Sequence, residues 1–373
     1  MEEGFLFKDV YNKHLVENMA SNIQNSWSEF NISSFVNSIT PKLDALSLSK
    51  RSQLICIELY NHLPKDFPKA LKILLNSFNP EMGTTNIQGF EGFYYMPIAD
   101  YVSRFGLEKE DFHFSINALI EITKRFTSEN AIRPFIRKFP KETFQYLHQW
   151  TNNENVHVRR LISEGTRPKL PWASPLREFQ KDPSPVLELL EKLKEDDELY
   201  VRRSVANNLN DIAKDHPDLV VETLARWNKT NNKGTQWIIG HASRTLLKQG
   251  HPKALELLGF PQNIQIKVNN LRVNRPTCQL GDEIELSFEL ESLSADKQNL
   301  MIDFIVHYMK ANGKTAPKVF KLSKKSIPAS GCLPFKKKIS FKPITTRKHY
   351  LGQHEIEIQI NGMKYEKVSF VVE

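Results

Sequence analysis

Two segments of this 373-residue chain resemble each other at a spacing typical of helical repeats. The segment NENVHVRRLISEG covers residues 153–165 and DELYVRRSVANNLNDIA covers residues 197–213, so their Val-Arg-Arg cores lie 43 residues apart. A looser third copy, KGTQWIIGHASRTLLKQG, covers residues 233–250. A period of about 40 residues is typical of HEAT-type repeats, in which paired helices stack into a solenoid. The repeat therefore predicts a helical solenoid over this region.

Hydrophobic periodicity extends this prediction and ends it near residue 262. Apolar residues recur at steps of three and four in LDALSLSKRSQLICIELYNHL, PKALKILLNSF and DLVVETLARW, as expected of helices. Later segments such as EIELSFELES and HEIEIQING alternate with period two, and Gly281-Asp282 and Asn361-Gly362 are turn signals. Roughly seven short strands in about 110 residues favour an immunoglobulin-like sandwich. We expect an all-α solenoid of HEAT-like repeats over residues 1–262, followed by an all-β Ig-like sandwich over residues 263–373.

Several classes of protein are disfavoured by the sequence. No apolar run approaches the ~20 residues that cross a bilayer, and the start MEEGFLFKDVYNKHLVEN has no signal-peptide core, so we expect a cytoplasmic protein without a membrane partner. Cys56, Cys278 and Cys332 form no CxxC pair, and the 11 histidines include no HExxH motif, which argues against disulfides and metal sites. GxGxxG, GxxxxGKS/T and GxSxG motifs are missing too, and we expect no cofactor.

The net charge of +8 is concentrated in the C-terminal third. Residues 264–373 hold 18 Lys and Arg against 11 Asp and Glu, whereas residues 1–263 hold 33 against 32. This imbalance suggests a polyanionic partner for the C-terminal domain, although a solubilising surface would explain it equally well. The run Lys336-Lys337-Lys338 lies in an expected strand, where alternation should expose two of the three. Lys337 is either a phosphate contact or a guard against edge pairing.

The second repeat helix carries a polar stripe opposite an apolar one. Arg203, Asn207, Asp211 and Lys214 recur at steps of three to four, and we expect them to face outward. Arginine and lysine suit phosphate contacts, and asparagine suits contacts to the sugar or backbone. A carboxylate weakens DNA binding unless it has a function, so Asp211 either takes part in chemistry or pairs with Arg203 or Lys214.

Carboxylates flanked by arginines recur along the chain. Three segments share the combination: Glu129 with Arg133, Glu164 with Arg160 and Arg167, and Asp211 with Arg203. Two tryptophans accompany them, since Trp172 follows Pro171 in RRLISEGTRPKLPW and Trp237 opens a repeat helix. Exposed aromatic rings beside arginines can stack on sugars or bases, although either ring could instead fill space between repeats.

The strings SEGTRPKLPW, DPSPVLELLEKLKEDDELYVRRSVANNLNDIAKDHPDLV and GHASRTLLKQG resemble the AlkC-type DNA alkylation-repair glycosylases, which are HEAT-like proteins related to the AlkD group. The resemblance runs from LPKDFPKALKILL to about residue 260, and an Ig-like C-terminal domain fits one AlkC subgroup. It implies excision of N-alkylated bases, such as 3-methyladenine and 3-methylcytosine, from double-stranded DNA. It also implies that the base is not fully extruded, in contrast to most glycosylases.

The resemblance gives the carboxylates a function. An N3-alkylated base is cationic and leaves without protonation, so the enzyme must stabilise an oxocarbenium-like sugar and supply water at C1′. The resemblance assigns Asp211 and Glu129 to catalysis, Glu164 as a third carboxylate nearby, and Trp172 to bracing the sugar or lesion. No metal or organic cofactor is implied. The remaining expected DNA contacts are Arg133, Arg159, Arg160, Arg167, Arg203, Asn207, Lys214, Trp237, Arg244 and Lys337.

Two other functions fit the same architecture. A HEAT-like solenoid with an Ig-like domain could be a scaffold that binds proteins, or a binder of DNA structures without activity. Only DNA binding should weaken steeply with ionic strength. The basic C-terminal domain predicts a clamp on the duplex through the minor groove, so deleting residues 264–373 should lower affinity and activity. We expect a monomer.

Overall fold

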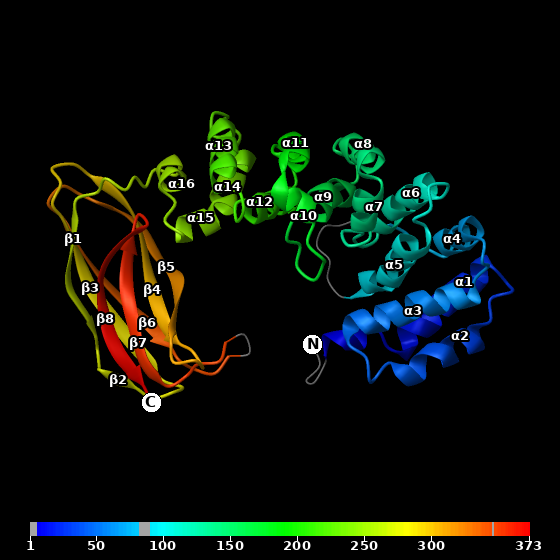
Figure 1. The fold of residues 1–373 in the computed structure, drawn as a ribbon, viewed down its shortest axis with the longest axis horizontal. Coiled ribbons are helices and arrows are strands. Elements are labelled where there is room, and N and C mark those ends of the chain that lie inside the picture. Colours follow the sequence, from blue (N-terminus) through cyan, green and yellow to red (C-terminus); the bar gives the residue numbers. More distant parts are fainter. Residues whose placement is uncertain (1–5, 82–89, 345–346) are drawn as a thin grey trace. The chain divides into compact units, whose positions relative to one another are not determined.

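The computed structural model describes residues 6–81, 90–344 and 347–373. Contacts divide the chain into two compact units (Figure 1). The first unit comprises residues 1–215 and 230–242, and the second comprises residues 216–229 and 243–373. In the described residues helices extend to Leu257 and the first strand begins at Ile266, so the expected fold class is confirmed.

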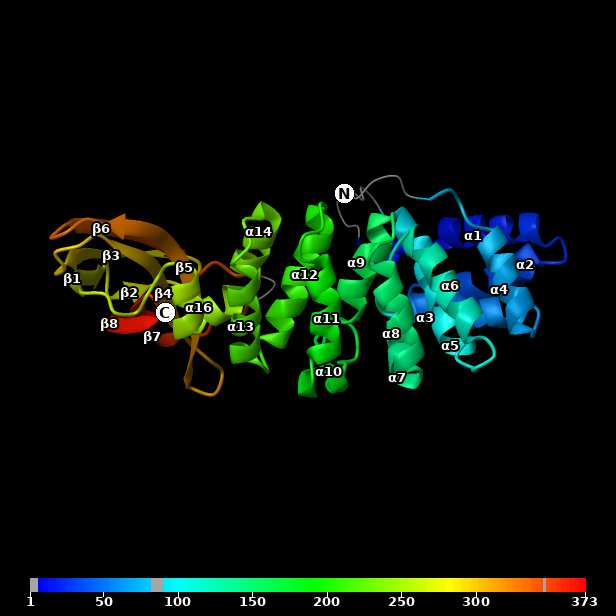
Figure 2. The ribbon, with the colours of Figure 1, turned by 90° about the horizontal axis from the view of Figure 1, so that it is seen from above.

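The first unit is helical. Its α-helices are α1 (Lys13–Ser26), α2 (Ile32–Ile39), α3 (Leu48–His62), α4 (Phe67–Asn76), α5 (Met96–Phe105), α6 (Phe112–Thr123), α7 (Ile132–Lys138), α8 (Pro140–Trp150), α9 (Val156–Gly165), α10 (Arg177–Lys181), α11 (Ser184–Leu193), α12 (Leu199–Ile212) and α14 (Lys233–Ala242). Short 3₁₀ helices accompany them at η1 (Phe7–Val10), η2 (Thr40–Lys42) and η3 (Glu91–Tyr95). The first helices of the three similar segments are α9, α12 and α14, and α12 packs against both of the others (Figure 2). This stacking of one repeat on the next is what defines a solenoid.

Local sequence explains where many of these helices start. The Asp66 carboxylate caps α4 by accepting a hydrogen bond from the Lys69 amide at 2.8 Å, and the Asn155 side chain caps α9 by accepting one from His157 at 2.9 Å. Pro140 is the first residue of α8, where its missing amide hydrogen costs nothing. Capping at Asn155 fixes where α9 begins and therefore which of its residues reach the site described below.

In the residues that the structure describes, the second unit combines three helices with eight strands. The helices are α13 (Pro217–Trp227), α15 (Arg244–Lys248) and α16 (Pro252–Leu257). The strands are β1 (Ile266–Val273), β2 (Thr277–Cys278), β3 (Glu283–Ser292), β4 (Gln298–Met309), β5 (Thr315–Ile327), β6 (Cys332–Ser340), β7 (Gly352–Ile360) and β8 (Met363–Val372). They form a three-stranded sheet, β1-β3-β6, and a five-stranded sheet, β2-β8-β7-β4-β5.

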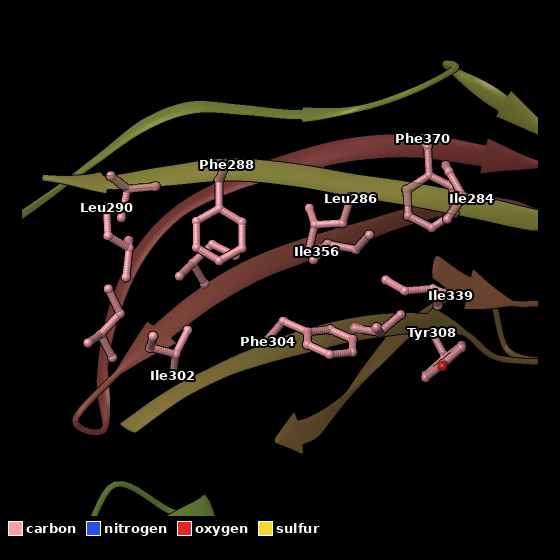
Figure 3. Packing of buried hydrophobic residues seen from close by; sticks show 14 of the residues in the cluster. Ile284, Leu286, Phe288, Leu290, Ile302, Phe304, Tyr308, Ile339, Ile356 and Phe370 are labelled. Carbon is pink, nitrogen blue, oxygen red and sulfur yellow. The ribbon is translucent and has the colours of Figure 1, made fainter. Parts of the chain in front are cut away.

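Alternating side chains build the core of the sandwich. Along β3 the residues Ile284, Leu286, Phe288 and Leu290 are buried while their neighbours are not. They face Ile302 and other apolar residues of the five-stranded sheet (Figure 3). Period-two burial on both sheets is the pattern expected of an aligned β-sandwich.

The turn predicted at Asn361-Gly362 is confirmed, and the Asn361 side chain also bonds this turn to neighbouring segments. Both residues have positive φ angles, 46° and 76°, as a tight hairpin between β7 and β8 requires. The Asn361 amide donates hydrogen bonds to the carbonyls of Pro261, at 2.7 Å, and Asn299, at 3.0 Å. Its side-chain oxygen accepts one from the Met301 amide at 2.7 Å. The Asn361 side chain therefore connects the segment before β1 to the start of β4.

The last helices share a small core with the sandwich. Leu247 of α15, Leu255 of α16 and Met301 of β4 form one buried cluster. Removing residues 264–373 would therefore expose apolar side chains of the helices that precede them. Among the described helices, none is both long and apolar enough to span a membrane.

Candidate active site

Three carboxylates are brought close together in the first unit. Glu129 lies in the turn before α7, Glu164 lies in the last turn of α9, and Asp211 lies near the end of α12. Glu164 is 5% exposed and Asp211 is 2% exposed, whereas the Glu129 side chain is 21% exposed. Buried carboxylates need partners, because an unpaired buried charge is costly.

Arg167 joins two of these carboxylates. Its Nη1 donates to Glu164 Oε1 at 2.5 Å and its Nε donates to Asp211 Oδ2 at 2.8 Å. Lys214 donates from Nζ to the other oxygen of Asp211, Oδ1, at 2.8 Å. Both oxygens of Asp211 are therefore bonded to cations.

Arg160 joins the third carboxylate to the second. Its Nη1 donates to Glu129 Oε2 at 3.0 Å, and its Nη2 lies 3.8 Å from Glu164 Oε2. The guanidinium also lies 4.8 Å from the centre of the Tyr200 ring, where a cation–π contact is favourable. Burial acts to lower the pKa of Arg160, but Glu129, Tyr200 and Glu164 outweigh it and raise the pKa above its ordinary value. The site therefore holds a permanent positive charge among its carboxylates.

Two serines complete the network, and the sequence analysis did not identify them. Ser204 Oγ donates to Glu164 Oε2 at 2.6 Å, and Ser163 Oγ donates to Ser204 Oγ at 2.7 Å. The Asn208 amide donates to the Ser163 carbonyl at 2.8 Å. These contacts link α9 to α12 across about 40 residues of sequence, a period that repeats impose. The repeat itself was the signal that could have found them.

Glu129 differs from the other two carboxylates in having an unused oxygen. Its Oε2 accepts from Arg160 and from Thr127 Oγ1, both at 3.0 Å. Within the described ranges, no hydrogen bond reaches Glu129 Oε1. The partly exposed Glu129 thus presents a carboxylate oxygen to solvent beside two buried carboxylates.

Trp172 projects from the loop between α9 and α10. Its side chain is 90% exposed, and its φ of 64° is a left-handed backbone conformation that a bulky residue rarely adopts. Strain of this kind persists only where the surroundings impose it, and it clusters at functional sites.

The buried Arg133 supplies that constraint. Its Nη1 donates to the carbonyls of Gly165 and Arg167, and its Nη2 donates to the Ser174 carbonyl, each at 2.9 Å. The Arg133 side chain is 2% exposed, and burial together with Arg137 lowers its pKa to about 10. The three bonds hold both ends of the loop that carries Trp172.

Two expectations from the sequence are therefore corrected. Arg133 was expected to contact phosphate, but it is buried and donates to three carbonyl oxygens instead. Asp211 was expected to face outward with Arg203, but it is buried with its neighbour Asn210. The polar stripe of α12 turns partly into the interface with α9, because Arg167 supplies a buried cation there.

The other expected contact residues have varied surroundings. Arg159 forms a two-bond ion pair with Asp196, at 2.6 and 3.1 Å. Arg203 and Lys214 are exposed, and Asn207 is half-buried. Trp237 is half-buried and stacks on His241, with ring centres 4.7 Å apart.

Arg244 and Lys337 belong to the second unit, outside the unit that holds the carboxylates. Arg244 is half-buried. All three lysines of the run 336–338 are exposed, where two had been expected. Lys337 lies opposite the buried Leu286 in the β3–β6 register, on a strand that ends its sheet. A charge on the inner side of an edge strand is a known guard against edge pairing, so the geometry favours that alternative.

No group of three or more His, Cys, Asp and Glu side chains that could hold a metal ion occurs in the part of the chain that the structure describes. Cys56 and Cys278 are buried free thiols and Cys332 is an exposed one.

Comparisons with known proteins agree with this architecture. A model of DNA alkylation repair enzymes matches residues 115–246, and a model described as the C-terminal Ig-like domain of the uncharacterised protein YhaZ matches residues 267–373. The uncharacterised protein YhaZ of Bacillus subtilis is 37% identical over 98% of this chain and 99% of its own length. The alkylpurine DNA glycosylase AlkC of Pseudomonas fluorescens, bound to DNA containing an abasic site analogue, is 34% identical, covers 98% of this chain and 99% of its own, and has a TM-score of 0.89. The chain belongs to the AlkC-type family of DNA alkylation repair proteins with an Ig-like C-terminal domain.

Proposed function

We propose that the protein is a DNA glycosylase that excises cationic N-alkylated bases, such as 3-methyladenine and 3-methylcytosine, from double-stranded DNA. The observation that carries this proposal is the cluster of Glu129, Glu164 and Asp211 in the same unit as the exposed, strained Trp172. Negative charge beside a bound strand would weaken DNA binding, so three carboxylates favour a reaction over binding alone. The similarity to the glycosylase AlkC supports the same conclusion.

The chemistry asks for negative charge at a developing cation. An N3-alkylated base departs as a neutral molecule when its N-glycosidic bond breaks, and positive charge develops on the sugar. Carboxylates fixed in advance stabilise that charge without reorganisation, and they do so best where water is excluded. Glu164 and Asp211 meet this condition because they are buried and their orientation is fixed by Arg167.

Glu129 is the carboxylate best suited to orient the water. Its Oε1 has no partner in the described residues, whereas Glu164 and Asp211 use both of their oxygens. The water attacks C1′ as the base leaves, and its proton passes to a base such as this carboxylate. Trp172 braces the lesion or its sugar, and the exposed Arg203 binds phosphate.

The test is release of free base from methylated duplex DNA. Asp211→Asn should lower the single-turnover rate by about 10²–10³-fold, since it removes one fixed charge at the developing cation, while binding to an abasic duplex is retained. Asp215→Asn is the matched control. Asp215 lies four residues after Asp211 and outside the cluster, where it pairs with Lys169. Absence of release by the wild type on every alkylated duplex would overturn the proposal. Retained activity in Asp211→Asn with loss in Glu129→Gln would move the main electrostatic role to Glu129.

The Ig-like domain is proposed to add DNA affinity. Lys310, Arg347 and Lys348 line one cavity at the loop end of the domain. Reversing two of these charges, Lys310→Glu with Lys348→Glu, should lower affinity for duplex DNA and reduce the slope of its salt dependence by about 2. These exposed residues are better targets than a deletion of residues 264–373, which would also expose Leu247 and Leu255. Unchanged affinity and slope would contradict the role.

A further inference from the structure

A cavity in the helical unit lies beside Trp172, and apart from Trp172 it is lined by residues that the chemistry proposed above does not use. It has a volume of about 430 Å³, within the range of sites that take small molecules. Its walls come from α3, α5, α7, the turn before α7 and the loop of residues 172–174, and they include Gln53, Asp100, Asn130, Arg133, Trp172 and Ser174. We call it the Trp172 cavity.

Its polar groups have unused hydrogen-bonding capacity. Asp100 Oδ2 accepts from Ser52 Oγ at 2.7 Å, and Gln53 Oε1 accepts from Lys50 at 3.1 Å. Within the described residues, no hydrogen bond reaches Asp100 Oδ1, Gln53 Nε2 or the amide of Asn130. The cavity therefore offers a carboxylate acceptor, an amide donor and one complete amide.

Arg133 adds a buried donor. Its Nε lacks a hydrogen-bond partner although the side chain is 2% exposed. Buried polar groups are nearly always bonded, so an exception calls for an explanation such as a ligand or a water molecule. Burial also raises the pKa of Asp100, which makes a proton-donating form of this carboxyl more accessible.

This set of groups suits a nucleobase better than a phosphate. Asn, Gln and Asp side chains are those that pair with the donor and acceptor edges of bases, and an exposed indole provides a face for stacking. A phosphate would meet the Asp100 carboxylate, while the Nη atoms of Arg133 and Nη2 of Arg137 are already bonded to backbone oxygens.

We propose that the Trp172 cavity binds an unstacked nucleobase, with the edge of the base on Asp100, Asn130 and Gln53 and its face against Trp172. This inference rests on the proposed function, because excision creates two such bases. One is the base that hydrolysis releases, and the other is the base left opposite the abasic site. Both present the same chemistry to the cavity.

Two binding assays on the full-length protein distinguish these sources. The first measures binding of free 3-methyladenine by equilibrium dialysis in the presence of saturating abasic duplex. The second compares the dissociation constants of two duplexes, one with an abasic analogue opposite thymine and one with abasic analogues on both strands. The variants are Asn130→Ala, at an exposed position where misfolding is not expected, and the double variant Asp100→Asn with Asn130→Ala. Glu110→Gln, an exposed carboxylate outside the cavity, is the control.

The wild type should bind the free base, or should prefer the duplex that keeps the opposite thymine by about tenfold, the effect of one or two hydrogen bonds. In whichever assay the wild type responds, the double variant should reduce the affinity for the free base, or the preference for the thymine duplex, by about tenfold. Asn130→Ala should reduce it by a smaller factor, and Glu110→Gln should leave it unchanged. A wild type silent in both assays, or a response that the variants do not change, would overturn the inference. Release of base from methylated DNA is measured separately, so a protein that excises but is silent in both assays retains the proposed function and loses only this inference.

Discussion

The helices α9 and α12 carry the same Val-Arg-Arg core, and the first arginine of each core makes the same kind of hydrogen bonds. Arg159 donates from Nη1 to two carbonyl oxygens five and six residues earlier, both at 2.9 Å. Arg202 does the same in its own repeat, at 2.6 and 2.7 Å. Each arginine thus closes the turn that leads into its helix, and both repeats keep this contact.

The second arginines differ. Arg160 pairs with Glu129 and lies over Tyr200, with its side chain 18% exposed. Arg203 is exposed, and no ion pair of the described residues includes it. Both repeats therefore keep the contact of the first arginine, whereas the second arginine has different surroundings in each copy.

The largest effect is expected at Arg167, which bridges Glu164 of α9 and Asp211 of α12. Arg167→Met removes the cation between two buried carboxylates and should lower the free energy of unfolding by about 3–5 kcal/mol. Lys169→Met is the control, because Lys169 pairs with Asp215 at the surface and should cost at most about 1 kcal/mol. Denaturant unfolding followed by circular dichroism measures both. Equal losses in the two variants would show that the bridge contributes nothing beyond a surface pair.

The next largest effect is expected at Glu164, and it tests whether α9 contributes to catalysis at a position where α12 does not. Asn207 lies 43 residues after Glu164, at the equivalent position of the repeat. Glu164→Gln therefore gives α9 the kind of side chain that α12 has there. We expect the rate of base release to fall by about 10–1,000-fold with little change in affinity for abasic DNA.

Glu154→Gln, at an exposed position before α9, is the matched control for this substitution. A full rate of release in Glu164→Gln, with the control also unchanged, would remove Glu164 from the catalytic group.

Much of the fold could be predicted because it depends on local periodicity. Alternation located β3, and the Asn361-Gly362 pair located the turn before β8. Strand β5 was not predicted. It is an edge strand with several exposed lysines, so solvent on that side obscures the alternation that buried strands show.

The site was less predictable, because its contacts are not local. Spacing of four residues relates Arg160 to Glu164, but Arg167 and Asp211 are 44 residues apart and meet only through the packing of repeats. The same limit explains the error over Asp211. A polar stripe on a helix indicates a solvated face unless a neighbouring segment supplies a buried cation, and nothing near Asp211 in sequence reveals Arg167, which lies in the loop after α9.

The first arginines of the two repeats should have similar but unequal effects on stability. Arg202→Ala removes two bonds to carbonyl oxygens, and we expect a loss of about 1–2 kcal/mol. Arg159→Ala also leaves Asp196, whose side chain is 4% exposed, without its ion-pair partner, so its loss should be about 2–3 kcal/mol. Unfolding by urea measures the difference. An equal loss at both positions would mean that the Arg159–Asp196 pair adds nothing to the shared role.

Substitution of Arg203 should have the smallest effect on stability, and it tests what the exposed second arginine of α12 contributes to DNA binding. Because its side chain is exposed, Arg203→Ala should change the free energy of unfolding by no more than about 0.5 kcal/mol. If Arg203 contacts one phosphate, affinity for duplex DNA should weaken by a similar factor on damaged and undamaged sequences, and the slope of log K against log salt should fall by about 1. A loss confined to damaged DNA would instead place Arg203 at the lesion, and the second arginines of both repeats would then share a role after all.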